Sequence, residues 1–279
     1  MAESLIGPRR RPAWRFSVTV GCATLVGLVA TATLAPVLAP HSPTRQHLAS
    51  DLRGPTRTHP LGQDKLGRDQ LSRVVYGSRV SLQVGLTTVA VSVVIGVLVG
   101  AAAGFIGGAL DFWLMRVVDV LLAFPGILLA IAMSAVLGPS LTNVIVALSL
   151  IGWTGYARLV RAEVMAIKRR EHVEAADALG VPRALVLTRH VLPLLAAPLV
   201  VQATFGMAGA IIAEASLSFL GLGVQPPTPS WGSMVNEGRA FLLVAPHLTV
   251  YPGLAILFTV VGLNFLGDGL RDWLDVRAR

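Results

Sequence analysis

The chain has 279 residues, of which 54% are hydrophobic and only 14% are charged, and its formal net charge is +8. About a quarter of the residues in a soluble globular domain are charged, so this composition argues against that class. A basic chain can bind nucleic acid, but the Lys and Arg residues form no soluble, aromatic-rich module here, and we expect no nucleic-acid partner.

Charged residues are absent from four long runs, 16–44, 80–110, 120–157 and 240–267, and a fifth run, 190–236, holds only Glu214. A membrane-spanning helix needs about 20 mostly apolar residues. The run 120–157 is too long for one span and contains the turn signal Gly138-Pro139-Ser140, so we divide it in two. The sequence therefore predicts an all-α, polytopic membrane helix bundle with six transmembrane helices, at 17–38, 80–106, 118–137, 141–159, 193–217 and 248–267.

The first predicted span follows Arg9, Arg10 and Arg11, as the apolar core of a signal peptide would. Its apolar core exceeds the roughly 7–15 residues of a signal sequence, so we expect a retained membrane helix.

Six spans place both termini on one side of the membrane. If the termini are cytoplasmic, 15 of the 23 Lys and Arg residues are cytoplasmic too, as the positive-inside rule favours. We expect 1–79 to hold a cytoplasmic tail, the first helix and an external segment. The main membrane domain is then 80–279, with a cytoplasmic loop at 160–192.

The sequence contains none of the motifs by which such a chain would act as an enzyme. No G-x-x-x-x-G-K-[ST] loop is present, since Gly62 and Gly67 are followed by Arg68-Asp69, so the chain cannot be its own ATPase. The six histidines form no H-E-x-x-H pair, and the single Cys22 cannot form a thiolate cluster. We expect no enzymatic activity, no metal ligands and no cofactor in this chain.

The connection 158–193 is the most informative segment, and it reads as two short helices joined at a corner. Good helix formers precede Gly180, which is a natural left-handed stop. Glu171 and Glu174 offer charged partners to basic groups, while the small residues Ala175 and Ala176 let another surface come close. Such a helix is suited to dock into a groove of another protein. An amphipathic helix lying on the membrane surface is the alternative interpretation.

Four glycines, Gly96, Gly100, Gly104 and Gly108, follow one another at four-residue intervals in and just after the second predicted span. Small residues on one helical face let a second helix approach closely in a membrane. Helix flexibility is the alternative, but a face this regular is more than a hinge requires, so we expect packing.

Glu214 is the only acid well inside an apolar run. A carboxylate in lipid is costly and by default functional. The residue lies near the external end of its predicted span, so a role in the substrate path and a structural role as a cap or ion-pair partner both stay open.

The spacing of Glu174-Ala175-Ala176, Gly180 and Leu192-Pro193 resembles the EAA signature of permease subunits in binding-protein-dependent ABC importers. In that family the loop is a coupling helix that inserts into the ATPase subunit. The resemblance implies a role in ATPase coupling for Glu171, Glu174, Ala175, Ala176 and Gly180.

Three further segments resemble the C-type permeases of dipeptide, oligopeptide and nickel importers. They run from His59-Pro60-Leu61-Gly62 to Tyr76-Gly77, from Glu214-Ala215-Ser216 to Ser230-Trp231-Gly232, and from Asn264 to Asp272. The chain departs from the family at Asp275-Val276, where Asp-Pro is usual. We take Glu214 and Asn264 as candidates for the substrate path.

The resemblance implies a type I ABC importer permease architecture and uptake of di- or oligopeptides across the cytoplasmic membrane. It also implies a homologous second permease, two ATPase subunits that bind ATP and Mg²⁺, an external solute-binding protein and a surrounding lipid membrane. Uptake of nickel or a metal chelate is the alternative within the subfamily. An intramembrane hydrolase or a channel would be a different class, for which the sequence offers no nucleophile and base, and no use for the docking loop.

Overall fold

The computed structural model describes residues 13–277, and within that range all regular elements are helical apart from one isolated β-bridge between Gln63 and Asp69. The predicted all-α fold class is confirmed. The basic residues Arg9, Arg10 and Arg11 lie outside the described residues. In chain order, with η marking short 3₁₀ or π turns, the elements are α1 (Ala13–Thr33), α2 (Ala35–Leu38), η1 (Leu48–Ser50), α3 (Gln70–Ile106), α4 (Gly108–Ala123), α5 (Gly126–Leu137), α6 (Leu141–Ile167), α7 (Glu171–Ala178), α8 (Arg183–Leu185), η2 (Val186–Val191), η3 (Leu192–Leu195), α9 (Ala196–Phe219), α10 (Trp231–Gly238), η4 (Arg239–Phe241) and α11 (His247–Arg277).

Five of the six predicted spans are continuous helical segments that are long and apolar enough to cross a membrane. They are Trp14–Thr33, Gln70–Ile106, Leu141–Ile167, Arg183–Phe219 and His247–Leu274. Most are longer than predicted. The prediction used the charge-free residues, which mark only the part of a helix that lies in lipid, whereas each helix continues beyond them. The second span, for example, begins ten residues early at Gln70, where the Asp69 side chain accepts a hydrogen bond from the backbone N–H of Ser72 and caps the helix.

The predicted span 118–137 is not one continuous helix. The chain forms α4 and α5 instead, and their axes meet at an angle of 84°. Pro125 explains the break, because proline has no backbone N–H and disfavours the helical conformation in the residue before it. Phe124 is accordingly extended, with φ −90° and ψ 137°. The bent pair counts as a sixth span only when its two helices are taken together.

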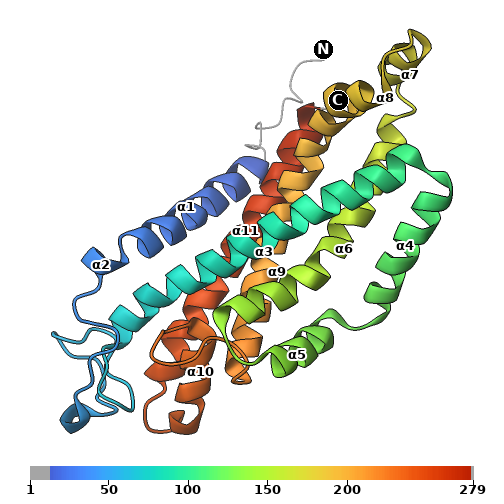
Figure 1. The fold of residues 1–279 in the computed structure, drawn as a ribbon. Helices are drawn as coiled ribbons and strands as arrows, with labels where there is room; N and C mark the ends of the chain where they lie inside the picture. Colours follow the sequence, from blue (N-terminus) through green and yellow to red (C-terminus); the bar gives the residue numbers. More distant parts are fainter. Residues whose placement is uncertain (1–12, 278–279) are drawn as a thin grey trace, which may run out of the picture.

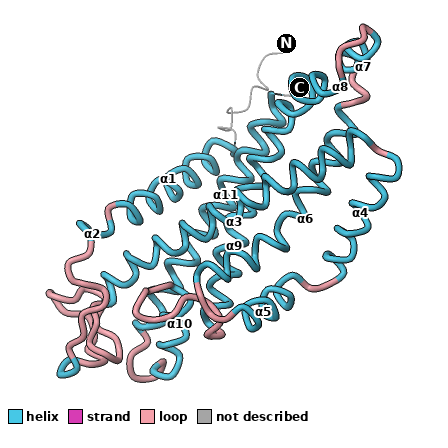
Figure 2. The backbone as a smooth tube through the Cα atoms, viewed as in Figure 1, coloured by secondary structure: helices cyan, strands magenta, loops and turns pink. Residues whose placement is uncertain are grey.

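Long helices α3, α6, α9 and α11 run side by side, with α1 along the outside and the bent α4–α5 pair on the opposite side (Figure 1). The start of α1, the end of α11 and the short helices α7 and α8 lie at one end of the bundle. The segment 39–69, which the sequence predicts to be external, and α10 lie at the other end, where the loops concentrate (Figure 2). The termini of the described chain therefore share an end with the predicted coupling loop.

Three of the four glycines form the predicted packing face. A Cβ atom on Gly100 would lie 2.5 Å from the Ala157 carbonyl oxygen, and one on Gly104 would lie 2.8 Å from the Arg161 carbonyl oxygen, so α3 touches the backbone of α6. Gly96 meets α6 one turn earlier, at Tyr156. The prediction for Gly108 is wrong.

Gly108 does not belong to that helix at all. The α3 helix ends at Ile106, and Gly107 and Gly108 turn the chain with φ of 74° and 60°. Nothing lies within 4 Å of a Cβ placed on Gly108. Gly108 follows Gly104 by four residues, so it matches the glycine spacing although it lies beyond the end of α3. Gly107 and Gly108 instead form the turn into α4.

Ion pairs then join α4 to α6. Arg161 Nη2 donates to Asp111 Oδ2 over 2.7 Å, and Arg158 pairs with Asp119. These ion pairs attach the α4 half of the bent pair to the bundle, and α5 packs on α6 through the buried Ala130.

Candidate functional site

The predicted docking helix exists as α7, at the end of the molecule that also holds the start of α1 and the end of α11 (Figure 1). Glu171 and Glu174 lie in its first turn. Acidic side chains there interact favourably with the positive end of the helix dipole, so these residues stabilise the short helix as well as charging its surface.

Gly180 ends α7 in the manner expected from the sequence. It has φ of 77°, its backbone N–H donates to the Asp177 carbonyl oxygen over 3.0 Å, and the N–H of Val181 donates to the Ala176 carbonyl oxygen over 3.1 Å. These two bonds form a Schellman motif, which requires a left-handed residue at the glycine position. Nothing lies within 4 Å of a Cβ placed on Gly180, so a side chain there would be strained but would point into open space.

The two faces of α7 have different surroundings. Val173 and Ala176 are buried against the end of α6 and against η2, so Ala176 anchors the helix to its own chain. Glu171, Glu174, Ala175 and Gly180 are exposed. Leu179 is 84% exposed, which is unusual for a leucine. The sequence analysis did not predict that Leu179 is a surface residue. The signal for it was its position directly before Gly180, the residue predicted to end the helix.

A groove with a volume of about 220 Å³ separates α7 from the end of α3. Glu174 and Asp177 line one wall, Arg183 and Lys168 contribute positive charge, and Phe105 belongs to the α3 side. Lys168 Nζ donates to the Phe105 carbonyl oxygen over 2.7 Å, which ties the end of α6, just before α7, to the end of α3. The groove and the exposed side of α7 together form a charged surface with a glycine turn at its tip.

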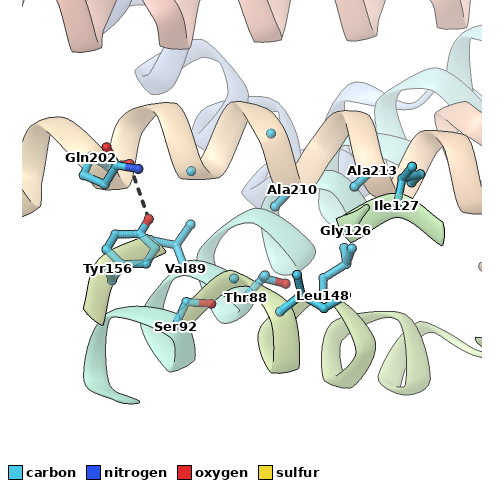
Figure 3. Close-up of a pocket in the computed structure, with 14 residues that line it drawn as sticks. Thr88, Val89, Ser92, Gly126, Ile127, Leu148, Tyr156, Gln202, Ala210 and Ala213 are labelled. Carbon is cyan, nitrogen blue, oxygen red and sulfur yellow. Dashed lines mark hydrogen bonds between the residues drawn. The ribbon is translucent and has the colours of Figure 1, made fainter. Parts of the chain in front are cut away.

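A second candidate site is a cavity of about 270 Å³ in the middle of the bundle, between α3, α5, α6 and α9 (Figure 3). Its lining is mostly apolar, but the side chains of Thr88, Ser92, Tyr156 and Gln202 bring polar groups to it. Tyr156 Oη donates to the Gln202 carbonyl oxygen over 3.3 Å.

The hydroxyl groups of Thr88 and Ser92 are buried and find no hydrogen-bond partner among residues 13–277. Burying a hydroxyl group without a hydrogen-bond partner costs folding free energy, so a polar molecule or water that bonds to these two groups is favoured. No residue that lines the cavity carries a formal charge. The site therefore suits neutral polar groups such as peptide amides better than ions.

The two sequence candidates for the substrate path lie elsewhere. Glu214 is fully buried near the end of α9, where its Oε1 accepts a hydrogen bond from Ser218 Oγ over 2.6 Å. Ser218 Oγ in turn accepts from the N–H of Val224 over 3.2 Å, so this short network connects α9 to the loop that follows it. Asn264 lies partly buried on α11. Neither residue lines the cavity.

A charge quartet, defined as Asp64, Arg68, Arg73 and Glu237, lies at the end of the bundle where the loops concentrate; its first three members are buried and Glu237 is half-buried. Asp64 Oδ2 accepts from Arg68 Nε over 2.6 Å and from Arg73 Nη1 over 2.7 Å. Glu237 Oε2 accepts from the same two guanidinium groups over 2.8 and 3.2 Å. The quartet thus joins the segment before α3, α3 itself and α10 into one cap.

Burial raises the pKa of Glu237 above the usual value of a glutamate, and the positive charge of Arg68 opposes that rise. Trp231 adds a further contact, because its Nε1 donates to the Val74 carbonyl oxygen over 2.9 Å. Trp231 therefore ties α10 to α3 and is part of the cap's structure. The quartet itself was not foreseen.

The molecule is a multi-span helical membrane protein with a projecting charged helix at one end, a rigid cap at the other and a neutral polar cavity between them. Its sequence lacks a nucleotide-binding loop. These features are those of a membrane transport subunit.

Comparison with known proteins gives the family. The family model of the binding-protein-dependent transport system inner membrane component matches residues 93–279, and the chain belongs to this family. It is 41% identical to a dipeptide transport system permease protein of Alkalihalophilus pseudofirmus, over 93% of this chain and 86% of the relative. It is 46% identical to a glutathione transport system permease protein of Pectobacterium atrosepticum, over 81% of this chain and 75% of the relative. A putative peptide transport system permease protein of Brucella suis is 43% identical, over 97% and 91%. The chain is a multi-pass inner-membrane permease component with the type I helical architecture, and the resemblance stated from its motifs is confirmed.

Proposed function

We propose that this chain forms half of the translocation path of an ABC importer that brings small peptides across the cytoplasmic membrane. The observation that carries the proposal is the 41–46% identity, over most of the chain, to permeases named for dipeptide, glutathione and peptide transport. Glutathione and dipeptides share short backbones of neutral amide groups with charged ends, so a peptide substrate fits all three relatives.

The proposed assembly contains a homologous second permease, two ATPase subunits that bind ATP and Mg²⁺, and an external solute-binding protein. Both termini and α7 are cytoplasmic in this proposal, because 15 of the 23 basic residues then lie inside. The cap around the charge quartet then faces outward, where the solute-binding protein would deliver the peptide.

We assign the coupling role to the exposed part of α7. The surface that an ATPase subunit would contact includes Glu171, Glu174, Ala175 and Gly180. The buried Ala176 packs the opposite side of α7 against the rest of the chain. ATP binding closes the ATPase dimer, α7 moves with it, and the spans rock between inward-open and outward-open states. Coupling requires the contact to differ between the two states, because an equal contact shifts no equilibrium.

The central cavity is our first candidate for a substrate contact, since Thr88 and Ser92 offer free hydroxyl groups at the level of the membrane interior. Glu214 and Asn264 stay candidates on sequence grounds. Glu214 is better suited to control the external end of α9 than to bind the substrate directly, because its carboxylate is buried against Ser218.

The coupling proposal is tested with the complete complex in proteoliposomes. Glu174→Lys reverses one charge of the docking surface, and we expect loss of ATP-driven peptide uptake while the permease still inserts and ATP hydrolysis continues uncoupled. Asp272→Lys is the matched control, because Asp272 is an exposed acid at the same end of the bundle but on α11. Normal uptake by the Glu174→Lys complex would refute the assignment. Competition of labelled dipeptide uptake by unlabelled peptides and by a nickel chelate separates the proposed substrate class from its alternative.

A further inference from the structure

Two histidines and an aspartate, His41, His59 and Asp69, meet in the segment before α3. His59 Nδ1 lies 2.8 Å from Asp69 Oδ1, and His41 Nδ1 lies 3.8 Å from the same oxygen. The two imidazole rings stack with their centroids 4.5 Å apart. One ligand atom from each of the three residues falls within 4.8 Å of the others. No sequence motif predicts this group, because only the fold of the segment before α3 brings it together.

The carboxylate of Asp69 is arranged so that one oxygen remains for these histidines. Its Oδ2 accepts hydrogen bonds from the backbone N–H of Ser72 over 2.8 Å and from Ser72 Oγ over 2.7 Å. Its Oδ1 faces both Nδ1 atoms. Because Ser72 fixes the carboxylate from behind, Oδ1 is held at a defined position at the start of α3.

The backbones of the two histidines are also tied down. The N–H of His41 donates to Ser72 Oγ over 3.1 Å, and the N–H of His59 donates to Thr56 Oγ1 over 3.0 Å. The three ligand atoms are therefore positioned by the fold and not by chance contacts of long side chains. The His41 side chain is 41% exposed, so the group is accessible from water.

The electrostatic setting favours a cation at this place. Asp69 is 3% exposed, and a buried carboxylate needs a charged or hydrogen-bonding partner. Its ion-pair partners among residues 13–277 are the two histidines, which carry a full charge only when protonated. The neighbouring arginines, Arg68 and Arg73, are bound to Asp64 and Glu237 instead. A bound metal ion would supply the permanent positive charge that the carboxylate lacks.

The chemistry of the donors selects the kind of ion. Two imidazole nitrogens and one carboxylate oxygen suit zinc and its neighbours, whereas Ca²⁺ and Mg²⁺ prefer oxygen ligands alone. Tetrahedral ligands at about 2.0–2.2 Å from zinc lie roughly 3.3 Å from one another. The two histidine–carboxylate separations, 2.8 and 3.8 Å, lie on either side of that value, and all three ligand atoms lie within 4.8 Å of one another, so side-chain rotations bring them to a tetrahedral arrangement.

We propose that His41, His59 and Asp69 bind one divalent transition-metal ion of the zinc class, through Nδ1, Nδ1 and Oδ1, with water in the fourth position. The ion attaches residues 41 and 59 to the start of α3 and so fastens the external segment. It is bound by the permease itself and is distinct from any transported substrate.

The test uses the assembled complex, stripped with a chelator and then dialysed against Zn²⁺, with Mg²⁺ in a parallel sample. We expect one Zn²⁺ per permease chain above the content of a His41→Ala complex, with X-ray absorption showing two imidazole nitrogens in the first shell. His41→Ala and His59→Ala should each weaken Zn²⁺ binding by at least about tenfold, since changes even behind the ligands cost 10–100-fold.

His47→Ala is the matched control, because His47 is an exposed histidine of the same segment outside the group. It should keep the full Zn²⁺ content. Equal Zn²⁺ contents in the unmodified, His41→Ala and His47→Ala complexes would overturn the proposal, as would a first shell without imidazole. Because His41 is exposed, its replacement leaves the fold intact, and the absorption spectrum of the unmodified complex decides the question even if His59→Ala does not assemble.

Discussion

Gly100 packs directly against the backbone of Ala157, since a Cβ atom on Gly100 would lie 2.5 Å from the Ala157 carbonyl oxygen and 2.8 Å from Val160 Cβ. The α3 and α6 helices thus meet without intervening side chains. Gly100→Ala forces these helices apart, and overpacking of this kind costs about 1–3 kcal/mol. We expect a lower thermal unfolding temperature of the purified complex in detergent.

Gly155→Ala is the control for this substitution, because Gly155 lies on α6 and a Cβ atom placed on it would have no neighbour within 4 Å. Alanine there should be neutral or slightly stabilising, since it favours the helix more than glycine does. Equal unfolding temperatures for the Gly100→Ala and Gly155→Ala complexes would contradict the packing role of Gly100.

The glycine pattern also shows how far sequence reasoning reaches in this fold. Gly96, Gly100 and Gly104 were predictable because helical periodicity is a local property. Gly108 was not, because the pattern does not reveal that Gly107 already ends the helix. The break at Pro125 has a local signal in the proline itself, but charge-free runs do not reveal it, because the apolar composition is the same on both sides of the bend.

Gly180 offers a way to separate helix termination from docking. Asparagine tolerates the left-handed conformation better than other residues with side chains, so Gly180→Asn should preserve the end of α7. Its side chain would project into the open space beside the tip. We expect normal membrane insertion but weakened co-purification of the ATPase subunits. Retention of both ATPase subunits and of peptide uptake would indicate that Gly180 only ends the helix.

The charge quartet predicts that replacing one of its arginines by an uncharged residue strongly lowers the stability of the fold. Arg73 is 2% exposed and binds both Asp64 and Glu237, so Arg73→Met leaves the buried carboxylate of Asp64 and the half-buried carboxylate of Glu237 with one guanidinium group. Breaking a buried ion pair on one side costs about 3–5 kcal/mol. We expect a lower unfolding temperature and faster proteolysis of residues 39–69.

Arg79→Met is the matched control, because Arg79 is an exposed arginine on the same helix that stacks on Tyr76. It should leave both readouts nearly unchanged. Equal proteolysis rates for the two variants would show that the quartet does not hold the cap together.

The quartet lay beyond sequence reasoning for a physical reason. Arg68 and Glu237 are 169 residues apart, and no periodicity connects a loop before one span to a short helix before another. Counting the basic residues predicts that the charges of 39–79 lie outside the membrane, but their pairing depends on how α3, α10 and α11 pack. The same holds for the central cavity, whose lining comes from four helices.

The central cavity predicts that hydroxyl groups there serve the transported molecule and not the fold. Thr88→Val keeps the shape of the side chain and removes a hydroxyl that has no partner among the described residues. Loss of an unpaired buried hydroxyl should leave the unfolding temperature unchanged or raise it, whereas loss of one hydrogen bond to the substrate should lower peptide uptake about 2- to 10-fold. Ser149→Ala is the control, because Ser149 has an equally unpartnered hydroxyl on α6 but does not line the cavity. Uptake should stay normal in that variant. If the Thr88→Val and Ser149→Ala complexes transported peptide equally well, the cavity would not be part of the substrate path. Glu214 and Asn264 would then be the remaining candidates for a substrate contact.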